Sequence, residues 1–404
     1  MHSTPTPLED RINELDIIRG FALFGIFLVN MPGYMFPELF SSLQRFPEHT
    51  GSVDFWLRMF LDMFAQTKFY AIFSFLFGIG FYLFMSRLEI RGEPVTGKYL
   101  RRLAGLFLFG VLHLFFWFGD ILHTYAVAGM LLLFFYRRRE AVIRRWAITI
   151  LVLFQIPMGL SLWFPVDEQA LQTEKEAQLA RQAVEVYQNG GFDEWLAFRW
   201  NYELPVLLEN EWMALFTVLP LFLFGLYAGK KGLFHQLDLK LPVIRRYWMI
   251  SMLIGLPLVA LIPLAYFGKV PFSGTRDIVH LVLVQWSGLA LFVFYITSIL
   301  LMTRREDLKK KLSFFAPVGR MALTNYMAQT LVCVSLVRVF DLYGQTPLWV
   351  GFVLCLLILP LQAAGSRWWL TRYHYGPLEW VWRCLTYGAV QSWKKCEAVN
   401  RRIL

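Results

Sequence analysis

A histidine and an aspartate lie seven residues apart within one of the most apolar stretches of the chain. They are His113 and Asp120, in the segment RRLAGLFLFGVLHLFFWFGDILHTYAVAG at positions 101–129. Seven residues are close to two helical turns, so this spacing predicts that both side chains share one face of a helix. A carboxylate beside an imidazole orients the ring and raises its basicity, as a general base for an alcohol or amine requires. We therefore predict His113 and Asp120 as catalytic residues; the alternative is a polar pair that joins two helices.

Other polar residues inside or beside apolar runs are candidates for binding a substrate or an acyl donor. An ionisable side chain at mid-bilayer depth costs roughly 2.5 to 3.5 kcal/mol, so each one requires a reason. Arg320 follows Pro317 and Gly319 near a predicted cytoplasmic helix end, where it could bind an anionic group such as a phosphate. Snorkelling to the lipid headgroups explains its position equally well. The candidate binding residues are Arg19, Asn30, Lys68, Tyr125, Arg320 and Asn325.

Several patterns argue against other chemistry. Gly78 and Gly80 lack the strand context of a phosphate loop, so we interpret them, with Gly105 and Gly110, as close helix contacts. The chain contains no P-loop, no H-E-x-x-H, no G-x-S-x-G and no cysteine cluster with metal spacing. We therefore expect neither nucleotide hydrolysis nor a metal site, and no bound cofactor.

The elements that must position these residues are membrane-spanning helices. The 404 residues are 57% hydrophobic and only 17% charged, and the apolar residues occur in runs long enough to cross a bilayer. The predicted fold class is an all-α integral membrane protein, a polytopic bundle of about ten transmembrane helices. The predicted spans lie near 17–35, 69–86, 103–118, 121–136, 146–164, 212–229, 248–267, 281–302, 319–340 and 347–366.

Lysine and arginine counts in the loops predict the orientation, because cytoplasmic loops carry the excess. The loops at 87–102, 137–145, 230–247 and 303–318 hold five each, whereas the loops on the other side hold eight in total. We therefore predict that both termini lie in the cytoplasm. The net charge of +10 is concentrated in these loops and the basic tail, which favours contact with anionic lipid. We expect the lipid bilayer as a partner and no nucleic acid.

The chain divides into two membrane halves joined by a polar segment. We predict an N-terminal five-span half at 1–164 with the His/Asp pair, an extracytoplasmic segment at 165–211, and a C-terminal five-span domain at 212–404. The middle segment has ten acidic and three basic residues, and it predicts a solvated helix over 169–188 that is broken at 189–191. It is either a binding lid or a plain connector. The basic tail at 373–404 is predicted to lie along the inner leaflet as an amphipathic segment.

Five segments, distributed over essentially the whole chain, resemble a known family. They are LDIIRGFALFGIFLVNMP at 15–32, KFYAIFSFLFGIGFYL at 68–83, the RRL...H...GDIL..YA pattern at 101–126, GRMALTNYMAQT at 319–330 and YGPLEWVWRCLTYG at 375–388. Together they are similar to the YeiB family of bacterial inner-membrane proteins. The C-terminal domain of that family, domain of unknown function 418, has no assigned function. The resemblance implies a multi-pass protein of the bacterial inner (plasma) membrane.

The first span and the histidine-bearing span are also distantly similar to transmembrane acyltransferases of the heparan-glucosaminide N-acetyltransferase type. Those enzymes use an intramembrane histidine and take an acyl-coenzyme A donor from the cytoplasm. For this chain the resemblance implies His113 as the base or acyl carrier. From their positions alone, we add Arg19 and Arg320 as contacts on the donor side.

Three functions stay open at this point. The first is transfer of an acyl group from cytoplasmic acyl-coenzyme A to a hydroxyl or amine of an envelope component, with His113 taking the proton. The second is transport of a small solute along the same polar residues. The third is a structural or regulatory membrane protein with the acidic outer segment as its partner surface.

Overall fold

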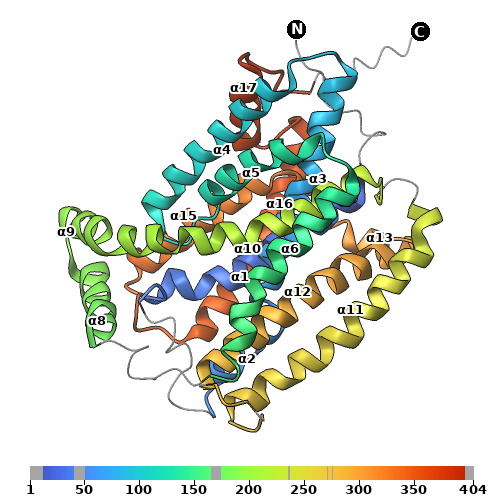
Figure 1. The fold of residues 1–404 in the computed structure, drawn as a ribbon. Helices are drawn as coiled ribbons and strands as arrows, with labels where there is room; N and C mark the ends of the chain where they lie inside the picture. Colours follow the sequence, from blue (N-terminus) through green and yellow to red (C-terminus); the bar gives the residue numbers. More distant parts are fainter. Residues whose placement is uncertain are drawn as a thin grey trace.

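The computed structural model describes residues 12–40, 51–164, 174–234, 237–270, 272–274 and 276–395. Within these ranges the regular secondary structure is helical (Figure 1), apart from an isolated bridge between Tyr373 and Lys394. The helices of the first half are α1 Asn13–Met35, α2 Val53–Phe64, α3 Lys68–Ile90, α4 Val95–Phe116, α5 Leu122–Tyr136 and α6 Glu140–Leu160. The outer segment and the next span contain α8 Glu174–Asn189, α9 Phe192–Phe198, the π-helix η2 Arg199–Glu203 and α10 Leu204–Lys230. The remaining helices are α11 Leu237–Tyr266, α12 Arg276–Met302, α13 Glu306–Leu312, α14 Phe315–Arg320, α15 Ala322–Val339, α16 Leu348–Arg372 and α17 Pro377–Tyr387.

Eight helical segments are long and apolar enough to cross a membrane, by length and composition. They are α1, α4, α6, α11, α12 and α16, together with the continuous stretches Val53–Ile90 and Phe192–Lys230. Each one overlaps a span predicted from the sequence. The all-α, polytopic fold class is therefore confirmed.

The two other predicted spans differ from expectation. The segment predicted at 121–136 forms α5, whose 15 residues extend about 22 Å, less than the roughly 30 Å of a hydrocarbon core. The segment predicted at 319–340 is interrupted at Met321, where φ −113° and ψ 38° separate α14 from α15. The 18 residues of α15 include two pairs of adjacent polar residues, Thr324–Asn325 and Gln329–Thr330, which lower its hydropathy. Ten crossings thus stay a prediction.

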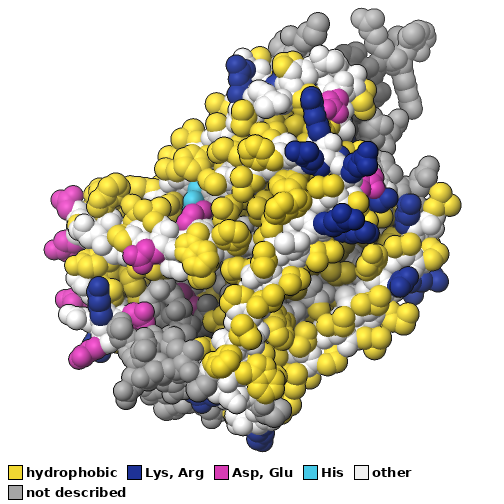
Figure 2. All heavy atoms as spheres, in the orientation of Figure 1, with side chains coloured by type: hydrophobic (Ala, Val, Ile, Leu, Met, Phe, Trp, Pro, Cys, Tyr) yellow, Lys and Arg dark blue, Asp and Glu magenta, His cyan; other side chains and the backbone are white. Residues whose placement is uncertain are grey.

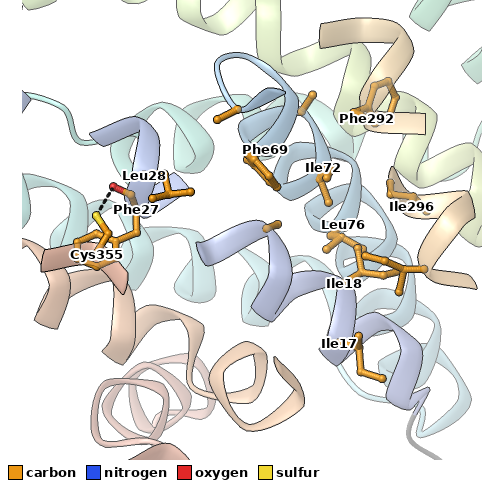
Figure 3. Packing of buried hydrophobic residues seen from close by; sticks show 14 of the residues in the cluster. Ile17, Ile18, Phe27, Leu28, Phe69, Ile72, Leu76, Phe292, Ile296 and Cys355 are labelled. Carbon is orange, nitrogen blue, oxygen red and sulfur yellow. Dashed lines mark hydrogen bonds between the residues drawn. The ribbon is translucent and has the colours of Figure 1, made fainter. Parts of the chain in front are cut away.

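Helix α1 forms the centre of the bundle. Figure 3 shows Ile18 of α1 near Leu76 of α3 and Ile296 of α12, all three within one buried cluster. On the other side of α1, the Sγ atom of Cys355 in α16 donates to the Phe27 carbonyl oxygen at 3.8 Å (Figure 3). Helix α1 is therefore packed against α3, α12 and α16.

Glycines allow the helices to approach each other closely. A Cβ atom at Gly78 would lie 2.0 Å from a backbone oxygen of α10, and one at Gly110 would lie 2.4 Å from a backbone nitrogen of α5. A Cβ at Gly105 would lie 3.0 Å from a ring of α17. The prediction of close contacts is confirmed at these three positions. It is wrong at Gly80, where nothing lies within 4 Å of the added atom, because Gly80 borders a cavity.

The surface separates apolar and charged regions. On the face drawn in Figure 2, hydrophobic side chains form a broad area, with Lys and Arg mainly toward the upper right and Asp and Glu at the left end, over α8 and α9. Large apolar side chains of several helices are exposed, including Phe134, Leu253 and Leu361. Such an exposed apolar surface is what contact with lipid requires.

The structure agrees in part with the predictions for the segment at 165–211 and for the basic tail. The predicted helix at 169–188 corresponds to α8, and the predicted break is confirmed because α9 starts only after Gly190 and Gly191. Residues 169–173 lie outside the described residues, as do residues 396–404 of the tail. Within the tail, α17 packs against α4 and α15, and its position along the inner leaflet stays a prediction. The predicted division into halves at 164 and 211 stays an expectation.

Two glycines on α3 offer a test of this packing. Gly78→Leu should lower the melting temperature of the purified protein by several degrees, because overpacking at a backbone contact typically costs about 1–3 kcal/mol. Gly80→Leu should not lower it, since its side chain enters open space and leucine favours a helix over glycine. Thermal unfolding in detergent, followed by intrinsic fluorescence, measures both. Equal losses in the two variants would contradict the packing described.

Candidate functional site

The structure brings His113 and Asp120 together, but not on one helix. His113 lies in the last turn of α4, which ends when Trp117 adopts an extended conformation with φ −155° and ψ 137°. Asp120 follows in the turn before α5, and its Oδ1 lies 2.7 Å from Nδ1 of His113. The indole nitrogen of Trp117 donates to the Gly33 carbonyl oxygen of α1 at 3.1 Å, which fixes this turn. The expectation of a shared helix face was wrong, because the helix stops before Asp120.

The second oxygen of Asp120 binds another histidine. Its Oδ2 accepts a hydrogen bond from the backbone nitrogen of His123 at 3.1 Å and lies 2.7 Å from Nδ1 of that residue. Nε2 of His123 lies 3.0 Å from Oε2 of Glu211 on α10. The Asp120 side chain is fully buried. Asp120 therefore caps the start of α5 and joins two imidazoles across the α4–α5 turn.

On its other side, His113 contacts a hydroxyl group. Nε2 of His113 lies 2.7 Å from Oγ1 of Thr330 on α15, and the Tyr34 hydroxyl of α1 lies 2.9 Å from the same oxygen. When Asp120 accepts from Nδ1, Nε2 of a neutral His113 is the acceptor, and Thr330 donates to it. Thr330 thus occupies the position of an alcohol that is poised to give its proton to His113. The amide of Asn30 approaches the Tyr34 hydroxyl.

This buried chain of polar groups lies between two cavities. His113 is 1% exposed and Thr330 is fully buried. Tyr34 and Trp117 border one cavity of about 350 Å³, whose other wall includes residues of α8 and α9; we name it the outer cavity after the predicted orientation. Tyr326 borders a second cavity of about 320 Å³, named the inner cavity for the same reason, and its ring centroid lies 4.7 Å from that of His113. A molecule in either cavity is thus separated from His113 by one aromatic layer.

The inner cavity is basic at one end. Its wall includes four arginines, which are Arg19, Arg102, Arg320 and Arg383. The guanidinium of Arg102 lies 3.7 Å from the ring centroid of Trp382 on α17. The carboxylate of Glu379 accepts hydrogen bonds from the backbone nitrogen and the hydroxyl of Thr324, at 3.0 and 2.6 Å. Burial raises the pKa of the Glu379 carboxyl, although the two bonds from Thr324 act in the opposite direction.

The predicted binding residues do not form one group. Arg19, Tyr125 and Arg320 border the inner cavity. Asn325 instead donates to Ser366 of α16 at 2.9 Å. Lys68 is fully buried and lies elsewhere, where its Nζ contacts the Asp62 carbonyl oxygen and the Ser287 hydroxyl at 2.8 and 3.0 Å. It holds the turn between α2 and α3 against α12, which is a structural position.

Several residues of this arrangement were missed by the sequence analysis. Tyr326 and Thr330 lie four residues apart, which places both on one face of α15, and this spacing was a usable signal. Arg102 and Arg383 were counted as ordinary cytoplasmic charges. Glu211 gave no signal, because its partner His123 lies 88 residues away. Among the described residues, no group of three or more His, Cys, Asp or Glu could hold a metal ion.

The Asp120 hydrogen bonds predict a large effect on stability. Asp120→Ala should lower the free energy of unfolding by about 3–5 kcal/mol, because it leaves buried polar partners without their acceptor. Asp193→Ala, at an exposed position of α9, is the control and should have little effect. Denaturation in mixed micelles compares the two. An unchanged midpoint for Asp120→Ala would show that this carboxylate does not hold the turn.

Known proteins resemble this chain over nearly its full length. It is 31% identical to "Uncharacterized protein YxaH" of Bacillus subtilis (strain 168), with 95% of this chain and 96% of the relative covered. The "Uncharacterized 39.9 kDa protein in amylase 3'region" of Bacillus acidopullulyticus shows the same identity and coverage, and "Uncharacterized protein YeiB" of Escherichia coli (strain K12) is 26% identical, with 93% and 96% covered. No solved structure matches the chain. Residues 228–389, from the end of α10 beyond α17, match the family described as "Protein of unknown function (DUF418)". The chain is therefore a member of the DUF418 family, and the expected relationship to YeiB is confirmed.

Proposed function

We propose that this membrane protein transfers an acyl group from cytoplasmic acyl-coenzyme A to a hydroxyl or amine of an envelope component. The observation that carries the proposal is the position of His113. Its Nδ1 is bonded to a buried carboxylate, its Nε2 lies 2.7 Å from a hydroxyl oxygen, and it lies between two cavities. An oriented imidazole that faces a hydroxyl is the arrangement of a general base.

The chemistry requires His113 and two substrates. In the proposed reaction, Nε2 of His113 takes the proton of the acceptor hydroxyl or amine, which then attacks the thioester carbonyl carbon. The carbon–sulfur bond breaks, the acyl group stays on the acceptor, and the departing thiolate takes the proton from the imidazolium. Asp120 stays ionised and holds the imidazole in the required tautomer. The substrate hydroxyl would take the place of Thr330, after Tyr326 or Tyr34 moves aside.

The proposal includes an orientation in the bacterial inner membrane. We infer that α5 and α15 complete ten crossings and that both termini lie in the cytoplasm. The predicted cytoplasmic loops carry five Lys and Arg each. Of the arginines that border the inner cavity, Arg102 belongs to one of these loops, Arg320 follows another, and Arg383 lies in the predicted cytoplasmic tail. The inner cavity then opens on the donor side, and the outer cavity, beside the acidic α8, on the acceptor side.

A carrier is the second candidate. The observation in its favour is that two separate cavities lie on either side of one polar cluster, as in a closed state of alternating access. Uptake of a solute by proteoliposomes, compared between the wild type and His113→Ala, tests this alternative.

Transfer of label tests the enzyme. Vesicles that contain the protein should incorporate radioactivity from acetyl- or palmitoyl-coenzyme A, labelled in the acyl group, into membrane material. His113→Ala should reduce the rate by about 10²- to 10⁴-fold, the usual contribution of a general base. His374→Ala is the matched control, because His374 borders neither cavity. Incorporation that does not differ between His113→Ala and wild type, or none from either donor, would refute the proposal.

A further inference from the structure

The inner cavity has a charged end and an apolar end. On α3 its wall is a single stripe of Phe73, Leu76, Phe77, Gly80, Phe81 and Phe84. Phe84 marks the charged end, because its ring centroid lies 5.2 Å from the guanidinium of Arg102. Phe73 is eleven residues away, so the stripe extends about 16 Å along the helix. The arginines therefore lie at one end of the cavity, and the apolar residues of α3 extend toward the other end.

The same polarity is repeated on the neighbouring helices. On α1, Arg19 is followed by Leu23 and Ile26 along the wall. On α14 and α15, Arg320 is followed by Leu323 and Tyr326, and Tyr326 contacts His113. The apolar end of the cavity is thus the end that reaches the catalytic candidate.

The charged end is suited to a phosphate group. Glu379 is the one carboxylate among the residues that border the cavity in the described part of the chain, against four arginines. One of these, Arg19, also pairs with Asp16 outside the cavity wall at 2.9 Å, so the wall keeps an excess of positive charge. Guanidinium groups match the geometry of phosphate oxygens and bind them with paired hydrogen bonds. Arg383, which lies 4.9 Å from the ring centroids of Tyr375 and Tyr387, and Arg102 are oriented by aromatic rings. A neutral or cationic ligand would gain nothing from this excess of positive charge.

We propose that the inner cavity binds a ligand with a phosphate-bearing headgroup on a long apolar chain. The headgroup lies among the four arginines, and the chain extends along the α3 stripe toward Tyr326. Its role as the donor in acyl transfer rests on the proposed function, whereas binding itself does not. Two sources share this chemistry, a long-chain acyl thioester of coenzyme A and an anionic phospholipid of the membrane.

A substitution at Gly80 changes only the apolar part of the inner cavity. A leucine at Gly80 would project into the cavity without meeting any atom within 4 Å of its Cβ. Gly365 in α16 also has nothing within 4 Å of an added Cβ, but it is exposed and does not border the cavity. Gly365→Leu is therefore a matched control for the effect of a leucine inside a long helix.

The experiment measures binding without a reaction. Tagged full-length protein, immobilised on scintillation beads in a neutral detergent, is incubated with labelled palmitoyl-coenzyme A, acetyl-coenzyme A or phosphatidic acid. We expect at least one of the two long-chain ligands to bind at least tenfold more tightly than acetyl-coenzyme A. Gly80→Leu should weaken that binding at least tenfold, and Gly365→Leu should leave it unchanged.

The binding preferences identify the ligand class or overturn the proposal. Strong binding of palmitoyl-coenzyme A that phosphatidic acid does not displace identifies the thioester as the source, and the reverse preference identifies the phospholipid. Arg102→Gln should weaken the binding of whichever long-chain ligand binds, because it removes one of the proposed contacts to phosphate. Acetyl-coenzyme A that binds as tightly as the long-chain ligands, or an unchanged affinity in Gly80→Leu, would overturn the assignment. Binding with the predicted preference but no transfer of label would leave the ligand class standing and remove the acyltransferase.

Discussion

The carboxylate of Asp120 is the group on which the rest of this arrangement depends. It is buried at the turn between α4 and α5, where it accepts hydrogen bonds from both histidines and from the backbone at the start of α5. Nothing in a lipid environment could replace these partners, so the turn closes tightly around the carboxylate. As a result α5 begins at Leu122, directly after the turn, and His113 is held with Nε2 directed toward Thr330 of α15.

The close packing of α1, α14 and α15 determines which side chains lie next to His113. The nearby α1 and α14 cross at glycines, where a Cβ on Gly20 would lie 2.0 Å from a carbonyl oxygen of α14 and one on Gly319 would lie 2.0 Å from a carbonyl oxygen of α1. The break at Met321 allows α15 to change direction after α14, and it places Tyr326 and Thr330 against the histidine. The two cavities lie above and below this layer of rings and hydroxyl groups.

Part of this structure could be predicted from the sequence. Hydropathy located the long helices, because membrane-spanning helices appear in a sequence as long, continuous apolar runs. The spacing of His113 and Asp120 also predicted that they lie close together, but it wrongly placed both on one helix. The helix end between these two residues could not be predicted, because Trp117 there donates a hydrogen bond to Gly33, 84 residues earlier. Thr330 is 217 residues from His113, so no local pattern could pair them. Arg19 and Arg320 were predicted as donor-side contacts, whereas Arg102 and Arg383 were counted only as cytoplasmic charges. The convergence of these four arginines could not be predicted, because it depends on the packing of α17 against α4.

In the proposed reaction, the donor reaches His113 from the inner cavity. The most direct measurement is a cryo-EM structure of the full-length protein with a non-transferable thioether analogue of palmitoyl-coenzyme A. We expect phosphates at the four arginines and a displaced Tyr326 ring. The carbon that stands in for the thioester carbonyl should lie about 3.5 Å from the position now held by Oγ1 of Thr330. A ligand bound outside the inner cavity, or bound inside it with its sulfur remote from His113, would show that the donor does not reach His113 by this route.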